Sequence, residues 1–170
     1  VLNSSFKLQI EDIGLQSARG TSLSGAAIEI APQNTNTLNV WPIFRAVQIS
    51  GCASDCGFNY GIKANRMNRS LMDRVAVNGQ CNGSEKMTAG FYYDYCYGPE
   101  LRDCFVSGAR TGMVLTNGGE GQVINRCVIT NADTGIFVHV DPWGYIPPSN
   151  FNGKVLNSVI CASSRGLYVV

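Results

Sequence analysis

Three carboxylates and one histidine are the side chains of this sequence that best suit acid–base chemistry. Asp94 lies among tyrosines and a phenylalanine in residues 91–97, and Glu29 precedes it in the chain. His139 is the only histidine and lies close to Asp141. Hydrolysis of a glycosidic bond by direct attack of water uses two carboxyl groups roughly 6.5–9.5 Å apart, one protonated and one ionised. These four residues are therefore the candidate catalytic groups.

A second group of side chains has the character of a sugar-binding surface. Flat aromatic rings suit the apolar faces of sugars, and polar groups beside them satisfy the hydroxyls. Both tryptophans fall in expected insertions, Trp41 in residues 31–43 and Trp143 in residues 140–154, and residues 78–89 form a third insertion. Trp143 is equally suited to clamping its own loop. The candidate substrate-binding residues are Tyr92, Trp143, Tyr145, Lys63 and Asn65.

The elements that must position these residues form a repeat. Residues 104–114, 127–137 and 158–168 share one frame: a short alternating apolar strand, a small polar turn, a glycine and a second alternating strand. Looser copies contain glycines at 25, 61 and 90, and the three clear copies contain the corresponding glycines at 112, 135 and 166. Asp103, Asn125, Asn131 and Asn157 fall at strand ends or turns, where such side chains bond their own backbone.

The glycine spacings of 36, 29, 22, 23 and 31 indicate a basic turn of 22 or 23 residues with insertions. Alternation by two, with many Val, Ile, Phe and Tyr residues, favours strands over helical repeats. We therefore predict an all-β fold, a right-handed single-stranded parallel β-helix of about six turns, as one domain over residues 1–170. The alternative is a β-sandwich, whose strands are joined by hairpins.

The glycine frame assigns side chains to the interior or the exterior. The first and third residues after each glycine are predicted to point inward: Ile62/Ala64, Phe91/Tyr93, Met113/Leu115, Ile136/Val138 and Leu167/Val169. Cys104/Val106 and Cys127/Ile129 are predicted to point inward from another strand, with the two thiols as stacked neighbours. Such buried thiols act as small hydrophobic groups more often than as redox sites.

The second and fourth residues after each glycine are predicted to point outward. In this frame Glu29 lies two turns from Asp94, and Asp94 lies two turns from His139, which gives about 9.6 Å between backbone positions in each case. This spacing approaches that of a hydrolytic pair. The alternative is that these polar residues only face solvent, as most surface side chains do.

Composition excludes several other functions. A formal net charge of +1 without a Lys/Arg run argues against nucleic-acid binding. No apolar run approaches the length of a membrane span, so we expect no membrane insertion. Seven cysteines are an odd number for a disulfide framework, and Cys52 with Cys56 lacks a second Cys/His pair for zinc. We expect reduced cysteines, no metal and no cofactor.

The repeat, with turns such as residues 123–136, resembles the central β-helix of bacteriophage tailspike and tail-fibre depolymerases, related in architecture to pectate lyases. The resemblance covers roughly residues 5–170 and is one of fold, without a family-defining catalytic motif. It implies a homotrimer on a virion that binds and cleaves bacterial surface polysaccharide with Asp/Glu pairs. The Asn-Thr-Asp and Gly-His-Gly elements of polygalacturonases do not occur.

Several functions remain open at this level. Glycoside hydrolysis is the first expectation, and a polysaccharide lyase or a non-catalytic virion or adhesin module are the alternatives. A lyase would need a base and a cation near a uronic acid, for which the candidates are Tyr92, His139, Lys63 and Arg66. Location on a phage tail is expected, with a secreted or cell-surface location as the alternative. The strand-like ends of the chain suggest a fragment of a longer protein.

Overall fold

The chain folds entirely into β-structure in the residues that the computed structural model describes, which are 6–17, 25–31, 40–51, 57–79, 86–117, 121–139 and 153–170. This part of the chain contains no helix, as predicted from the alternating pattern. Every strand pairing in it is parallel, which excludes the alternative of a hairpin-connected sandwich. No helix of the described residues is long and apolar enough to cross a membrane.

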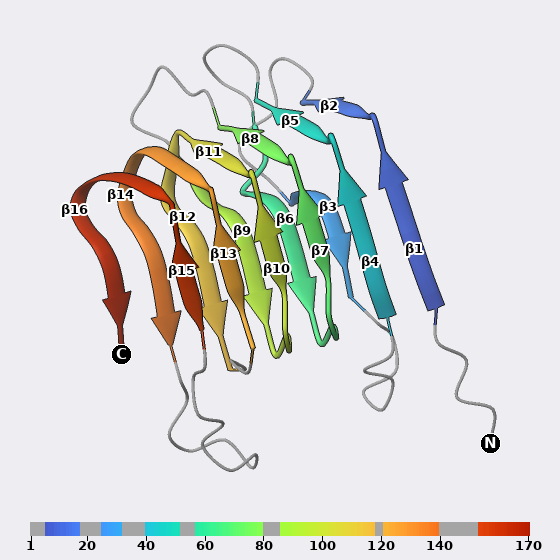
Figure 1. Cartoon of the computed structure of the whole chain (residues 1–170). Helices are drawn as coiled ribbons and strands as arrows, with labels where there is room; N and C mark the ends of the chain where they lie inside the picture. The colour runs from blue at the N-terminus through green and yellow to red at the C-terminus, as the bar shows by residue number, and fades with distance from the viewer. Residues whose placement is uncertain are drawn as a thin grey trace.

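The strands form two sheets that face each other in a nearly closed solenoid (Figure 1). The six-stranded sheet consists of β1 (Phe6–Glu11), β4 (Val40–Arg45), β7 (Leu71–Asp73), β10 (Glu100–Arg102), β13 (Val123–Asn125) and β15 (Lys154–Leu156). In Figure 1 the order of these strands follows the chain from β1 at one end to β15 near the other.

The ten-stranded sheet is bent into two limbs. The first limb contains β2 (Gly14–Gln16), β5 (Gln48–Ser50), β8 (Ala76–Asn78) and β11 (Phe105–Ser107). The second limb contains β3 (Ala26–Ile30), β6 (Tyr60–Asn65), β9 (Met87–Asp94) and β12 (Ala109–Thr116). The long strands β14 (Val128–His139) and β16 (Val159–Val169) run through both limbs, so the limbs belong to one sheet.

Single residues in the left-handed conformation turn the chain at the corners. The corner between the six-stranded sheet and the first limb has such a residue in each coil: Asp12, Ala46, Arg74, Asp103, Arg126 and Asn157. Each of the first five donates its backbone N–H to the carbonyl of the strand end in the next coil, at 2.9–3.1 Å. The corner therefore turns within one residue without interrupting the hydrogen bonds between coils. Asp103 and Asn157 lie at this corner and Asn125 ends β13, as predicted, whereas Asn131 lies within β14, in the left-handed conformation.

The interior is a set of stacked columns, one residue from each coil. The predicted inward residues Ile62, Phe91, Met113 and Ile136 occupy consecutive register positions and are fully buried. Ala64, Tyr93, Leu115 and Val138 form a parallel buried column. Because each coil covers the apolar residues of the next, burial is continuous along the solenoid.

A further column explains why glycine recurs once per coil. Val77, Val106, Ile129 and Ile160 share one register position in the first limb and in β14 and β16. An added Cβ on Gly61 would lie 2.5 Å from Val77 Cγ1, and one on Gly112 would lie 2.5 Å from Ile129 Cγ2. The facing β-branched side chain thus fills the place of a side chain at each glycine, and no positive φ is involved at either.

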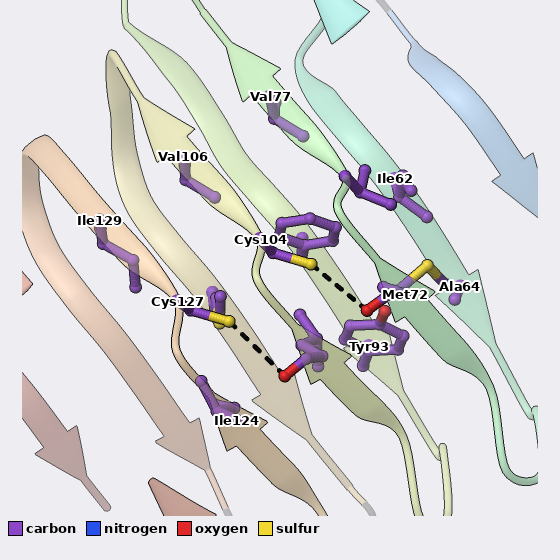
Figure 2. Packing of buried hydrophobic residues seen from close by; sticks show 14 of the residues in the cluster. Ile62, Ala64, Met72, Val77, Tyr93, Cys104, Val106, Ile124, Cys127 and Ile129 are labelled. Atoms are coloured by element: carbon purple, nitrogen blue, oxygen red, sulfur yellow. Dashed lines mark hydrogen bonds between the residues drawn. The ribbon is translucent and has the colours of Figure 1, made fainter. Parts of the chain in front are cut away.

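The buried thiols stack as predicted. Cys104 and Cys127 are free, about 1% exposed, and lie in neighbouring coils (Figure 2). The Cys104 thiol is 3.4 Å from the Met72 carbonyl, and the Cys127 thiol is 3.6 Å from the Leu101 carbonyl, the two contacts drawn in Figure 2. The hydrogen bond with the neighbouring Cys127 thiol raises the pKa of the Cys104 thiol, and burial raises it further. Cys52 and Cys56 lie outside the described residues.

The predicted frame is wrong in its first copy. Ile28 pairs with Ile62, so Ala27 and not Gly25 is equivalent to Gly61. Gly25 has φ +58 and open space around its missing side chain, so the turn before β3 requires it for its conformation. In the last copy Leu167 and Val169 continue the inward columns but are 56% and 54% exposed, because no coil of the described chain covers β16.

The predicted insertions are shorter in the structure. Trp41 lies in β4 and not in a loop, in register with Lys7 of β1. Met87 and Ala89 of the expected 78–89 insertion lie in β9, and Lys154 begins β15. Strand pairing with the neighbouring coils therefore extends further than the sequence pattern indicated.

Candidate functional site

The candidate site is the outer surface of the second limb, which we call the aromatic face. Its first column contains, in register, Glu29, Lys63, Tyr92, Val114, Phe137 and Tyr168. Its second column contains Asn65, Asp94, Thr116 and His139. The structure thus brings Lys63, Asn65, Tyr92, Asp94 and His139 together on one surface, as predicted.

Three of the six residues in the first column are aromatic: Tyr92, Phe137 and Tyr168. The Tyr92 ring lies 5.3 Å from that of Tyr60 in an edge-on arrangement. The Phe137 ring lies 5.4 Å from Tyr168 and 6.2 Å from His139, and it is nearly parallel to the imidazole. Strand pairing holds these backbones about 4.8 Å apart per coil, so the rings form a row along the solenoid.

Asp94 is held at the centre of the second column. Its Oδ1 accepts hydrogen bonds from Thr116 Oγ1 at 3.0 Å and from Asn117 Nδ2 at 2.9 Å. Both donors are neutral, and Asn117 lies in the left-handed turn that follows β12. Two donors on one oxygen fix the orientation of the carboxylate group on the outer surface.

Lys63 forms an ion pair with Glu29 within the first column. Its Nζ lies 2.9 Å from Glu29 Oε1 and 5.7 Å from the centre of the Tyr60 ring. The hydrogen bond to Glu29 raises the pKa of Lys63, and burial opposes this only in part. The ammonium group is therefore charged and already paired, with the tyrosines around it.

The predicted pairing of Glu29 with Asp94 is wrong. Glu29 lies in the column of Lys63 and Tyr92, two residues along the strand from the column of Asp94. Two strand spacings and two residues put the two backbones about 12 Å apart. Glu29 is also neutralised by Lys63. Asp94 and His139 do share a column and are two coils apart, as predicted.

Three predicted site residues lie outside the described part of the chain: Asp141, Trp143 and Tyr145. Among the described residues, no group of three or more His, Cys, Asp or Glu side chains is arranged to hold a metal ion.

Sequence reasoning placed Phe137 and Tyr168 on the outward strip, since both stand two residues after a glycine, but did not count them among the site residues. It missed other members of the aromatic face. Tyr60 precedes its glycine and Asn117 lies in the turn after its strand, so neither belongs to the outward positions of that frame. Arg165 also joins the face, with its guanidinium 3.9 Å from the centre of the Tyr168 ring.

No family model matches the chain, and no curated protein or solved structure is significantly similar to it. The class of protein therefore depends on the fold and the aromatic face alone.

Proposed function

We propose that this chain is a right-handed parallel β-helix of about six coils that binds bacterial surface polysaccharide along its aromatic face, as a tailspike-like module. The observation that carries the proposal is the register of Tyr92, Phe137 and Tyr168 in one outward column beside the polar column of Asp94. Rings of this kind contact the apolar faces of sugars, and the adjacent polar groups accept or donate hydrogen bonds to hydroxyls.

The shape of the surface suits a linear polymer. The two columns run across the strands, along the length of the solenoid, so a polymer lying along them would pass one residue of each column per coil. Tyr92 and Phe137 stand two coils apart with Val114 between them. Val114 is buried, and the two rings flank it in the same column.

Binding without cleavage is the form of this function that the geometry favours. Hydrolysis uses two carboxyl groups at a defined separation, and Glu29 lies too far from Asp94 and is paired with Lys63. Asp94 and His139, about two strand spacings or 9.6 Å apart, are the observation that keeps glycoside hydrolysis as a second candidate. Elimination from a uronic acid would draw on Tyr92, His139, Lys63 and Arg66.

Assembly into a homotrimer on a phage tail accompanies this proposal. Outward apolar residues of the first limb support it, among them Phe105, which is 37% exposed, and Val128 beside it in register. Exposed apolar side chains on neighbouring strands favour contact with another surface.

The test is incubation of the protein with a panel of purified bacterial capsules and lipopolysaccharides, with binding measured by co-sedimentation and products analysed. We expect saturable binding of a subset of polymers without release of fragments. New reducing ends would instead establish hydrolysis, and unsaturated ends would establish elimination. Absence of binding to every polymer in the panel would contradict the proposal.

A further inference from the structure

A pocket at the corner after the second limb lies apart from the two columns of the aromatic face. It has a volume of about 470 Å³ and is lined by Asn68, Arg69, Tyr97 and Glu100, with the backbone of Gly98 and Gly121. Arg69 N–H donates to the Tyr97 carbonyl at 2.8 Å, and Asn68 forms a parallel bridge with Tyr97. The pocket therefore has a base of hydrogen-bonded backbone from two consecutive coils, and its volume suits a sugar unit.

The charges of the pocket are unequal. The Glu100 carboxylate accepts from the Arg102 guanidinium at 2.6 Å, so its charge is compensated from outside the pocket. Arg69 has no carboxylate within ion-pair distance among the described residues. Arg69 thus brings to the pocket lining a cation without an ion-pair partner in the described part of the chain, beside Tyr97 and Asn68.

Two features fix the position of Arg69. Its backbone is in the left-handed conformation, with φ 52, at a corner stabilised by hydrogen bonds between coils. Its guanidinium lies 5.9 Å from the centre of the Trp41 ring on the six-stranded sheet. A cation over an indole face loses part of its freedom before any ligand arrives, so less is lost on binding.

We propose that this pocket binds the carboxylate of an acidic sugar unit, with Arg69 as its ion-pair partner and Trp41 as the residue that positions Arg69. A guanidinium forms two parallel hydrogen bonds with a carboxylate, while Tyr97 and Asn68 face the hydroxyls of the same sugar ring. The choice of a sugar as carrier of the carboxylate depends on the proposed polysaccharide binding. A carboxylate site of this kind narrows the ligands of the proposed polysaccharide binding to polymers that contain uronic acids or related acidic sugars.

The test is a titration of the whole chain with methyl glucuronide and, separately, with methyl glucoside and inorganic phosphate at equal ionic strength. Binding is followed by the NMR amide shifts of Asn68, Gly98 and Gly121. We expect saturable shifts with the glucuronide, at least tenfold weaker binding of the glucoside, and no saturation with phosphate. Saturation with phosphate at equal affinity would show a general anion site and overturn the proposal.

The variants Arg69→Asn and Arg74→Asn form a matched pair. Both arginines lie in the left-handed conformation at corners of the solenoid, but only Arg69 lines the pocket. Asparagine tolerates this backbone conformation, so both variants should fold. We expect Arg69→Asn to weaken glucuronide binding at least tenfold and Arg74→Asn to change it less than twofold.

Equal losses in the two variants, or none in Arg69→Asn, would overturn the assignment of Arg69. If neutral polymers bind in a Tyr92-dependent manner and the glucuronide causes no amide shifts at the pocket, this inference is overturned and the proposed function stands. Glucuronide binding at the pocket without any polymer binding would contradict the proposed function instead.

Discussion

Val106 occupies the space that a side chain on Gly90 would need: an added Cβ on Gly90 falls 2.5 Å from Val106 Cγ1 and 2.8 Å from the Gly112 carbonyl oxygen. Gly90 and Val106 belong to facing limbs of one sheet, in successive coils. The χ1 angle of valine is stiff, and the carbonyl is part of the strand pairing, so neither can move aside easily. The recurrent glycine is therefore a packing requirement of the solenoid.

Gly90→Ala should accordingly destabilise the fold. Overpacking of a filled interior costs about 1–3 kcal/mol, and we expect a loss of unfolding free energy in this range. Gly166→Ala is the matched control, because an added Cβ there meets nothing within 4 Å. Urea denaturation of the two variants measures the difference. Equal stability of Gly90→Ala and the wild type would show that the columns are loosely packed.

The ion pair of Asp103 and Arg126 predicts a pH dependence of stability. Arg126 donates two hydrogen bonds of 2.7 Å to the carboxylate and so lowers the pKa of Asp103. A carboxylate whose pKa is lower in the folded chain stabilises the fold above its unfolded pKa, and this contribution disappears as pH falls through the folded pKa. Asp103→Asn preserves the turn, since asparagine also adopts the left-handed conformation.

We expect the wild type to exceed Asp103→Asn in urea midpoint near neutral pH, and the difference to vanish when the pH is lowered to about 2. Added salt should reduce the difference at neutral pH, because both groups are exposed at the surface. A difference that persists in acid would mean that the carboxylate charge is not its cause.

The buried thiols should resist modification in the folded chain. Burial raises the pKa of Cys96 from 9.0 to about 12, which reduces its thiolate fraction about a thousandfold at mildly alkaline pH. Cys104 and Cys127 are almost fully buried, whereas Cys161 is exposed. Among the four cysteines that the structure describes, alkylation followed by peptide mass spectrometry should label Cys161 first and the three buried thiols only on unfolding. Rapid labelling of Cys104 in the native chain would contradict the packing in Figure 2.

Asp94→Asn separates binding from catalysis on the aromatic face. Asparagine retains an acceptor oxygen for Thr116 or Asn117, so we expect an unchanged fold and polysaccharide affinity within about twofold of the wild type. If the wild type releases fragments, their rate of formation should fall at least about a hundredfold, because the ionisable group is lost. If the wild type releases fragments and Asp94→Asn releases them equally fast, Asp94 takes no part in the chemistry.

The sequence predicted the parallel all-β arrangement and most of the interior because the physical cause of the repeat is visible in residue types. A glycine marks each coil from Gly61 onward, and alternation by two then assigns Ile62, Phe91 and Met113 to the core. Glycine also serves left-handed turns, however, and Gly25 is of that second kind. Residue type alone does not distinguish the two uses, and the misplaced frame carried Glu29 into the wrong column.

Sequence reasoning predicted the residues of the aromatic face that follow a glycine in the repeat and missed those outside that frame. Tyr92, Asp94 and His139 follow directly from the glycine frame. The contacts of Asn117 with Asp94 and of Arg69 with Trp41 join corners to strands of other coils, and the frame describes only residues within the strands. Trp41 was expected in a loop because sequence shows no partner strand, whereas pairing with β1 places it on a sheet.

The most direct test of polysaccharide binding on the aromatic face compares Tyr92→Ala, Phe137→Ala and Ile13→Ala in a titration with a polymer that the wild type binds. Ile13 is the control, since it is an exposed apolar residue outside the aromatic face. Loss of a ring that stacks on sugar should weaken binding about tenfold in the first two variants, with Ile13→Ala unchanged. Equal affinity of all three variants and the wild type would contradict the assignment of this face.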